Sequence, residues 1–492
     1  MNRTYQGVVT FARFLIGAFF RRVEVVGLSN VPANGGGLLV SWHPNGMIDP
    51  ALIFTFFPRQ VVFGARHGLF KVPGLGQIMR AVGTVPIFRS MDAKAMDPDA
   101  RRAANQRSLD ALAGQLARTS YSCLFPEGDS HDAPHPTRAR SGAARLYYRA
   151  RQLADGGDVP PVIVPVGLFY DDKQVFRSSA LIVFHPPLPL NPELDVTPGD
   201  GEDPDAAEAR VRALTAEIER VLHDVVHATD DWRLHHLMHR ARKLVRAERA
   251  HRAGSHLRAP RMEERILGFA RIRSGYVARM QTHPEQVEAI KRRLEEYDED
   301  LRALGLEDHE LDEAPRLVSP WLVALLLLQV VFVFLLLPPI LFIGFLVNAP
   351  VAGLLWVIAQ VGSKRQKDVA TAKLMVGAVL FPLAWIGAGV AVAVGQWQLA
   401  LAYPSLPDTP VLAGLTTSIL AFAGGAAGVR YLRVVRETAR AVRVRLTRQR
   451  ARVALAHLKV ERAELHDLLI GMGEGLDLPG EVAEDGRVVA DE

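Results

Sequence analysis

The sequence of 492 residues contains a single cysteine, Cys123. One thiol cannot form an internal disulfide, and it excludes centres built on several thiolates, such as structural zinc sites and iron–sulfur clusters. Cys123 stands in the apolar stretch 121–125, where we expect a small buried side chain. His131 and His135 flank Asp132, but no second cluster of ligands accompanies them. We therefore predict no metal site.

Lysine is also scarce, because only nine of the 58 basic residues are lysines. The net charge of +5 is modest, and its placement suits an anionic membrane surface better than nucleic acid. Residues 321–361 contain no Asp, Glu, Lys or Arg. The mean hydropathy of +0.09 thus averages a charged soluble region and a membrane region. We expect membrane lipids as partners, and no nucleic acid.

The first 30 residues lack the pattern of a secretory signal. Their apolar stretch, residues 7–20, is interrupted by Arg13 and is followed, rather than preceded, by its main basic pair. Phe11, Phe14 and Ala18 recur at helical spacing within it. Residues 1–34 therefore predict a helix that lies in the membrane interface or docks on the protein core, followed by a lead-in strand.

Short apolar runs alternate with helical patterns over residues 35–190. This alternation predicts an α/β domain, with a mixed sheet flanked by helices. The expected helices are 99–118 and 142–153. The expected strands are 37–41, 61–64, 84–88, 120–125, 162–167 and 181–184.

The rest of the chain is expected to be helical. Residues 321–361 are long enough for two spans of about 20 residues, and Pro338-Pro339 or Asn348-Ala-Pro350 could turn between them. By the positive-inside bias, the basic segments at 363–368 and 430–450 predict that both termini and the α/β domain are cytoplasmic. The expected parts are a charged helical extension (205–316), about four spans (319–430), a basic juxtamembrane helix (431–470) and an acidic disordered tail (471–492).

Eight arginines lie between residues 430 and 450, directly after the last apolar block. A solvated helix face is one explanation. We favour contact with lipid head groups, at about 1 kcal/mol for each arginine.

The segment Trp42-His-Pro-Asn-Gly-Met-Ile-Asp49 carries the sharpest chemical pattern. Six helical steps would leave His43 and Asp49 about 120° apart, so they do not share a helix face. Pro44 and Gly46 instead predict a loop between a strand and a helix. On such a loop Asp49 can orient the His43 imidazole, which can then deprotonate an alcohol. Taken alone, the pattern favours a simple turn beside a helix-capping Asp over a catalytic pair.

Three further segments follow at intervals of about 40 residues. Gly83-Thr-Val-Pro-Ile-Phe-Arg89 ends a strand with an arginine, Phe125-Pro-Glu-Gly128 runs from a strand into a tight turn, and Val162–Leu168 is a buried strand interrupted by Pro165. Each segment alone has a simple structural explanation. Their shared order and spacing do not. A phosphate-binding glycine loop, a serine nucleophile elbow and a zinc-protease motif at His235–His239 are all lacking.

Together the four segments resemble the motif blocks of the glycerolipid acyltransferase family, which acylates glycerol 3-phosphate and lysophosphatidic acid. The resemblance covers residues 20–190. It continues more weakly through Asp231-Trp232 and the basic loop 364–373. The five residues between His43 and Asp49, with Asn-Gly after His-Pro, look most like the branch that acylates glycerol 3-phosphate or dihydroxyacetone phosphate.

The resemblance implies transfer of an acyl group from acyl-CoA or acyl carrier protein to the hydroxyl of a phosphorylated glycerol, with acyl-CoA as co-substrate and no cofactor. His43 would be the general base and Asp49 its orienting partner. The implied substrate-binding residues are Arg89 for the phosphate, Glu127 with Gly128 for the acceptor, and Pro165 for the acyl-donor side.

The third block departs from the family pattern, because Asp129 and Ser130 follow Glu-Gly where the family usually has Thr and Arg. Arg138 and Arg140, just before an expected helix, offer replacement charge, and we expect Arg140 to contact the phosphate. The alternatives are a lysophosphatidic acid acyltransferase and a catalytically inactive membrane scaffold. The oligomeric state has no signal in the sequence.

Overall fold

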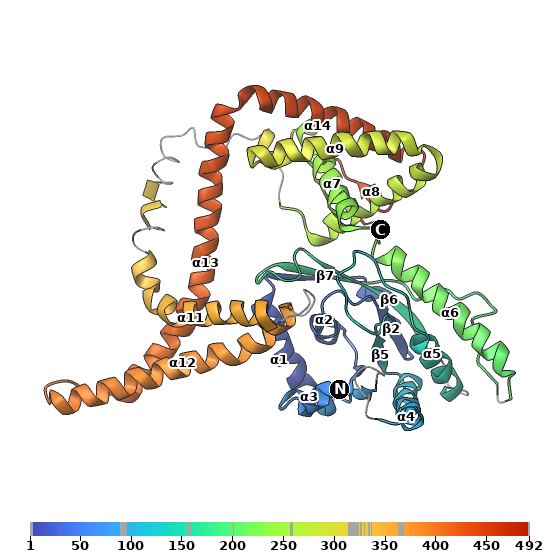
Figure 1. Ribbon diagram of the computed structural model, residues 1–492, viewed down its shortest axis with the longest axis horizontal. Coiled ribbons are helices and arrows are strands. Elements are labelled where there is room, and N and C mark those ends of the chain that lie inside the picture. Colours follow the sequence, from blue (N-terminus) through green and yellow to red (C-terminus); the bar gives the residue numbers. More distant parts are fainter. Residues whose placement is uncertain are drawn as a thin grey trace. The chain divides into compact units, whose positions relative to one another are not determined.

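The computed structural model describes residues 3–88, 96–154, 159–199, 201–255, 259–312, 337–362 and 369–490, with residues 324, 327–328, 330–332 and 335 (Figure 1). The chain divides into two compact units. The first comprises residues 1–235 with 365–371, and the second comprises residues 236–364 with 372–492.

A seven-stranded mixed sheet forms the centre of the first unit, in the order β1-β7-β6-β2-β5-β3-β4. β6, β2, β5, β3 and β4 run parallel, whereas β7 is antiparallel to β6 and carries β1 at the edge. The predicted fold class and all six predicted strands are confirmed. The strands are β1 (Arg22–Val26), β2 (Gly37–Ser41), β3 (Val61–Arg66), β4 (Val85–Ile87), β5 (Tyr121–Leu124), β6 (Val162–Tyr170) and β7 (Ser179–Phe184).

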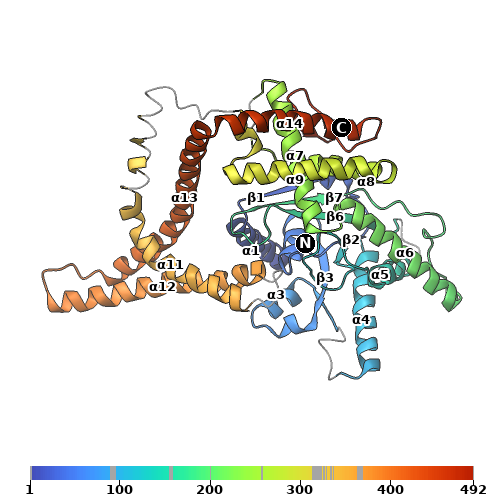
Figure 2. The same ribbon diagram turned by 45° about the horizontal axis from the view of Figure 1, so that its top comes forward.

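Three long helices pack side by side along the sheet (Figures 1 and 2). They are α4 (Pro98–Ala117), α5 (Gly142–Leu153) and α6 (Pro204–Val225). Their apolar faces bury Leu112, Leu146 and Leu214 against Leu38 and Val40 of β2. The sequence analysis expected residues 205–225 in the charged extension. The structure places α6 in the first unit instead, because its buried residues complete the core of that unit.

The N-terminal helix α1 (Arg3–Phe19) docks on α2 (Ile48–Phe56) through one face. The Tyr5 ring contacts the Phe54 ring, and its hydroxyl hydrogen-bonds to the backbone of Val61. This face of the helix therefore docks on the protein core, which was one of the two predicted arrangements. The opposite face leaves Phe11 and Phe14 exposed at 52% and 63%. The remaining short elements are η1 (Leu28–Asn30), η2 (His67–Lys71) and α3 (Leu75–Ala81).

Four helices of the second unit enclose a core of leucines that includes Leu244, Leu294 and Leu458. They are α7 (Trp232–Arg252), whose first residues belong to the first unit, α8 (Met262–Thr282), α9 (Pro284–Leu304) and α14 (Arg452–Gly473). The short turn η3 (Asp308–Leu311) packs against α14.

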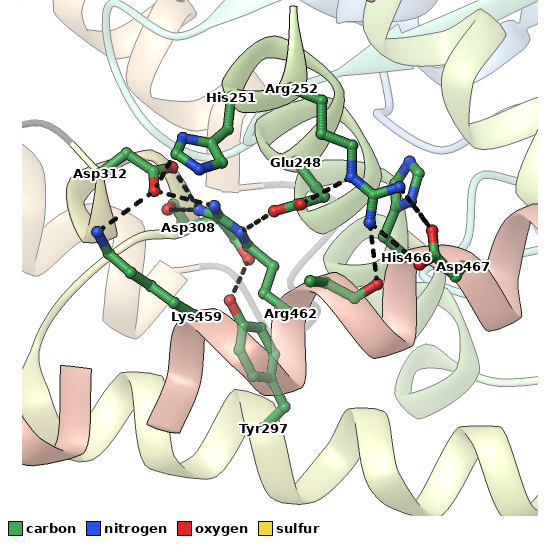
Figure 3. Close-up of polar contacts among 11 residues, drawn as sticks. Glu248, His251, Arg252, Tyr297, Asp308, Asp312, Lys459, Arg462, His466 and Asp467 are labelled. Carbon is green, nitrogen blue, oxygen red and sulfur yellow. Dashed lines mark hydrogen bonds and ion pairs between the residues drawn. The ribbon is translucent and has the colours of Figure 1, made fainter. Parts of the chain in front are cut away.

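A buried arginine links these helices (Figure 3). The Arg462 side chain, 1% exposed, donates to Glu248 of α7 at 2.9 Å and to both carboxylate oxygens of Asp312 at 2.6 and 3.0 Å. It also donates to the carbonyl of Asp308 at 2.8 Å. Tyr297 of α9 donates to the Asp308 carboxylate at 3.0 Å. The buried positive charge is thus paired with two carboxylates, as a buried charge must be.

Three apolar helices complete the second unit: α11 (Leu337–Gly362), α12 (Val369–Ala402) and α13 (Pro410–Arg450). Among the described residues, α12 and α13 are long and apolar enough to cross a membrane, and α11 contains a shorter apolar stretch, Gly344–Ile358. The turn considered at Asn348–Pro350 is wrong, because α11 runs through these residues as one helix. Most of residues 321–336 and the basic loop 363–368 lie outside the described residues, so the count of four spans stays a prediction.

Asn348 joins the three apolar helices. Its amide donates to the carbonyls of Gly344 and Ala421 at 2.7 and 2.8 Å, and it accepts a hydrogen bond from the Trp385 indole at 2.9 Å. A Cβ on Gly344 would lie 2.6 Å from the backbone of Gly424, so only glycine allows α11 and α13 to approach this closely. Small residues and shared polar side chains are typical of helix packing in membranes.

The basic segment and the tail differ from expectation. Arg440 pairs with Glu307 and Glu310, and Arg448 donates to the Glu310 carbonyl, so at least these two arginines bind protein. The tail, expected to be disordered, contains a hairpin of β8 (Glu481–Val482) and β9 (Val488–Val489). The Arg271 guanidinium donates to the backbone carbonyls of residues 478–480 in the tail. Because Arg271 is distant in sequence, the composition of the tail alone does not predict this contact.

Replacing the buried arginine, Arg462→Ala, is expected to lower the free energy of unfolding by about 3–5 kcal/mol, because it leaves Glu248 and Asp312 buried without their cation. Urea unfolding of the full-length protein in detergent measures this loss. Arg487→Ala, which removes an exposed pair with Asp485, is the control and should cost less than about 1 kcal/mol. Equal effects of the two substitutions would contradict the role of the buried arginine.

Candidate active site

His43 and Asp49 lie in contact on the loop between β2 and α2. Nδ1 of His43 is 2.8 Å from Oδ2 of Asp49, which also accepts the backbone N–H of Asn45 at 2.7 Å. Gly46 turns the loop with a φ of 46°. The His43 ring stacks on Phe125, with centroids 4.2 Å apart and planes at 17°.

The two members of this pair differ in exposure. The Asp49 side chain is 0% exposed and that of His43 is 18% exposed. Because Nδ1 donates its proton to the carboxylate, Nε2 is the nitrogen that can accept a proton from a substrate. The contact with Asp49 thus fixes the orientation of the imidazole.

Tyr170 is a site residue that the sequence analysis missed. The predicted strand 162–167 extends to Tyr170, and the tyrosine hydroxyl donates to Oδ1 of Asp49. Burial, and then the neighbouring Asp49 carboxylate, raise the pKa of Tyr170 well above its ordinary value, so the phenol stays protonated. The apolar run Leu168-Phe-Tyr170 is the signal that could have extended the strand.

Glu127 faces the catalytic loop. Its Oε2 accepts the backbone N–H of His43 at 2.7 Å, and its Oε1 accepts Nε2–H of His131 at 2.5 Å and the N–H of Thr137 at 2.8 Å. The residue is 4% exposed. The carboxylate therefore ties His43 to the loop 131–137, and His131 belongs to this cluster.

Gly128 and Arg140 lie against each other beside this cluster. Gly128 has a φ of 76°, and a Cβ there would lie 3.0 Å from the Arg140 guanidinium carbon. Arg138 and Arg140 are both exposed, just before α5, and neither has an ion-pair partner within the described part of the chain. The turn thus needs glycine, and it holds the Arg140 side chain along its surface.

The carboxyl ends of β2, β5, β3 and β4 meet at one edge of the sheet, because these strands are parallel. Arg89, predicted two residues beyond β4, lies outside the described residues. Arg66 ends β3 in register with Ile87, so it belongs to the same edge. The sequence analysis missed Arg66, whose place on this edge follows only from the strand order.

Pro165 lies in an internal strand and not at an edge. Its register partner on β2 is Val40, and the ladder with β7 begins only at Val166, so its missing N–H interrupts no bond to β7. The Pro165 carbonyl accepts the N–H of His185 at 3.0 Å. The strand is therefore continuous through the proline.

Two distant segments hold the catalytic loop from outside. Lys173 donates to the carbonyl of Pro44 at 2.9 Å and pairs with Asp132, and Asn45 donates to the Lys173 carbonyl at 3.3 Å. The Met47 N–H donates to Oγ1 of Thr371, in the first turn of α12, at 3.1 Å. Neither contact has a signal in the local sequence.

Cys123 is buried in β5, as predicted. Burial, and then Asp49, raise the pKa of its thiol far above the ordinary value, so it is no nucleophile at neutral pH. Within the described residues no group of three His, Cys, Asp or Glu side chains could hold a metal ion.

Comparisons with known proteins match two separate parts of the chain. Residues 22–168 match the family described as Acyltransferase, and residues 262–472 match the glycerol-3-phosphate acyltransferase 2 C-terminal domain. No curated protein matches the chain. A solved structure, the 1-acyl-sn-glycerophosphate (LPA) acyltransferase PlsC from Thermotoga maritima, is similar at 17% identity, over 44% of this chain and 79% of that chain, with a TM-score of 0.30.

The first match spans His43, Asp49, Glu127 and Pro165, and the second begins with α8 and ends within α14. The order of a catalytic domain and this C-terminal domain agrees with the resemblance found in the four motifs. The chain therefore belongs to the glycerolipid acyltransferase family, as an enzyme of the glycerol-3-phosphate acyltransferase type.

Proposed function

We propose that this enzyme transfers a fatty acyl group from acyl-CoA, or from acyl carrier protein, to a hydroxyl of glycerol 3-phosphate or dihydroxyacetone phosphate. The observation that carries the proposal is the buried Asp49 carboxylate against Nδ1 of an accessible His43. Acyl transfer to an alcohol needs such a base and no nucleophile from the protein.

The reaction then runs through His43. Its Nε2 takes the proton of the acceptor hydroxyl while that oxygen attacks the thioester carbonyl carbon. The carbon–sulfur bond breaks, and the leaving thiolate takes the proton back from the imidazolium. The negative Asp49 stabilises the imidazolium between these two steps. No cofactor is needed beyond the acyl donor.

Cationic groups at the same edge of the sheet suit the phosphate of the acceptor. Arg140 is exposed next to Gly128 and just before the N-terminus of α5, where backbone N–H groups favour an anion. Arg66 ends β3 at that edge, and Arg89 stands two residues after the end of β4 in the sequence. Guanidinium groups bind phosphate bidentately, so we assign the phosphate to this group of arginines.

Glu127 acts on the acceptor indirectly in this proposal. Its oxygens accept bonds from the His43 N–H, the Thr137 N–H and the His131 ring, so the carboxylate is occupied by the protein. It fixes the backbone from which the His43 side chain projects. Pro165, on the neighbouring β6, keeps its proposed place on the acyl-donor side.

We also propose that the enzyme is an integral membrane protein, with its catalytic unit and both termini in the cytoplasm. α12 exposes Val379, Leu383 and Ile386 at 57–59%, and α13 exposes Val411 and Leu415 at 72% and 59%. Such surfaces are stable in lipid and not in water. The exposed Phe11 and Phe14 of α1 suit the membrane interface.

The site also suits two neighbouring functions. A lysophosphatidic acid acyltransferase uses the same base on a different phosphorylated acceptor. An inactive membrane scaffold would not need the His43–Asp49 contact, and that contact favours an active enzyme.

The direct test gives the purified full-length protein labelled acyl-CoA together with each candidate acceptor, beside a His43→Ala variant. We expect labelled product with glycerol 3-phosphate or dihydroxyacetone phosphate, and a loss of kcat of about 10²–10⁴-fold in the variant. Thin-layer separation of the labelled lipid measures the product.

His283→Ala removes an exposed histidine of the second unit and serves as the matched control, which should keep the wild-type rate. Equal product from His43→Ala and wild type would refute His43 as the base. Product with lysophosphatidic acid alone would establish the first alternative, and no product with any acceptor would favour the scaffold.

A second prediction concerns Glu127. The Glu127→Gln variant replaces one acceptor oxygen by an NH₂ group, which cannot accept the hydrogen bonds that the carboxylate receives from His43, His131 and Thr137. We expect kcat to fall about tenfold and the acceptor KM to change less than twofold. Steady-state kinetics against acceptor concentration separates the two constants.

Glu219→Gln is the control for this substitution. The Glu219 carboxylate accepts the N–H of Ala139 at 2.8 Å but has no bond to His43 among the described residues. The kcat of Glu219→Gln should therefore equal that of wild type. A rise in the acceptor KM of Glu127→Gln at constant kcat would show instead that Glu127 binds the acceptor directly.

A further inference from the structure

We infer that Tyr170 is a positioning residue of the acyl-transfer site, whose hydroxyl fixes the Asp49 carboxylate against His43. This inference rests on the proposed function of His43 as the base. The tyrosine comes from β6, whereas Glu127 follows β5, and these two strands lie on opposite sides of β2. It therefore ties a separate strand to the catalytic pair.

The Asp49 carboxylate accepts hydrogen bonds from three donors. Oδ2 accepts from His43 Nδ1 and from the Asn45 N–H, and Oδ1 accepts from the Tyr170 hydroxyl. A carboxylate held at one oxygen only can rotate about its bond to Cβ. The bond at Oδ1 stops that rotation and keeps Oδ2 aimed at the imidazole.

The tyrosine is itself held rigidly. Its ring stacks on Phe20, with centroids 6.0 Å apart and planes at 30°, and Phe20 is 1% exposed. Its backbone pairs with Ala180 of β7. A rotation of the phenol would need movement in both the sheet and the end of α1, so the hydroxyl is pre-organised before substrate binds.

The phenol also remains a donor through the working pH range. Burial and the Asp49 carboxylate both favour its neutral form. The described titratable groups next to Asp49 are His43, Tyr170 and the buried Cys123 thiol, which stays protonated. Glu127 and His131 face the backbone of His43 from the other side.

The hydrogen bond has a chemical consequence beyond geometry. A carboxylate that accepts a third hydrogen bond attracts the Nδ1 proton less strongly than one that accepts two. Tyr170 therefore keeps the imidazolium from becoming too stable, and it eases return of the proton to the leaving thiolate. Loss of the hydroxyl should make His43 harder to deprotonate.

The test is Tyr170→Phe in the full-length protein, which removes only the hydroxyl. We expect kcat to fall about tenfold, with the KM values for acyl donor and acceptor within twofold of wild type. The acidic limb of the kcat profile should move to higher pH. An unchanged kcat, or a rise in KM at constant kcat, would overturn the inference.

A second readout does not depend on catalysis. Diethyl pyrocarbonate modifies neutral imidazole, and mass spectrometry of the His43 peptide follows its rate against pH. In Tyr170→Phe the half-maximal rate should move to higher pH by the same amount as the acidic limb. A fall in kcat without this shift would show that the hydroxyl only supports packing, and would also overturn the inference.

Tyr148→Phe is the matched control. The Tyr148 hydroxyl donates to the Leu194 carbonyl at 3.1 Å, away from the site, so its removal should change neither readout. The outcome also separates this inference from the proposed function. If His43→Ala keeps full activity, the proposed function fails. If His43→Ala is inactive and Tyr170→Phe behaves as wild type, only the role of Tyr170 fails.

Discussion

The buried carboxylate of Asp49 is the group around which the catalytic unit is organised. A carboxylate removed from water is tolerated only when its oxygens are paired, and here the imidazole of His43, the Asn45 N–H and the Tyr170 hydroxyl pair them. The donors come from the catalytic loop and from β6. Glu127, Lys173 and Thr371 hydrogen-bond to the same loop from distant segments, so His43, the proposed base, projects from a backbone that is held in place.

The second unit pairs its buried polar groups in the same way. In its helical core, Arg462 is accepted because Glu248, Asp312 and the Asp308 carbonyl take its donors. Among the apolar helices, the Asn348 side chain is satisfied by hydrogen bonds to neighbouring helices, which glycines allow to approach closely. The outward faces of these helices carry apolar side chains. A family match to a glycerol-3-phosphate acyltransferase 2 C-terminal domain spans both parts.

The local features of the catalytic domain could be predicted from the sequence, and its long-range contacts could not. Apolar alternation predicts the six strands, and the Pro-Asn-Gly loop predicts that His43 can reach Asp49, because these signals are local. Tyr170 ends β6 and Lys173 follows it, and both reach the site because β6 lies next to β2. This strand order cannot be read from local patterns in one sequence. The tail hairpin and the assignment of α6 were missed for the same reason: each depends on a buried surface contributed by a distant segment.

Asp49→Asn tests the central claim most directly, because it keeps the shape of the side chain and removes its charge. Measured as labelled acyl transfer by the full-length protein at saturating acceptor, kcat should fall at least about a hundredfold. The imidazole then loses both its orientation and the charge that stabilises its protonated form. A variant that stays folded and transfers acyl groups within twofold of the wild-type rate would contradict the account.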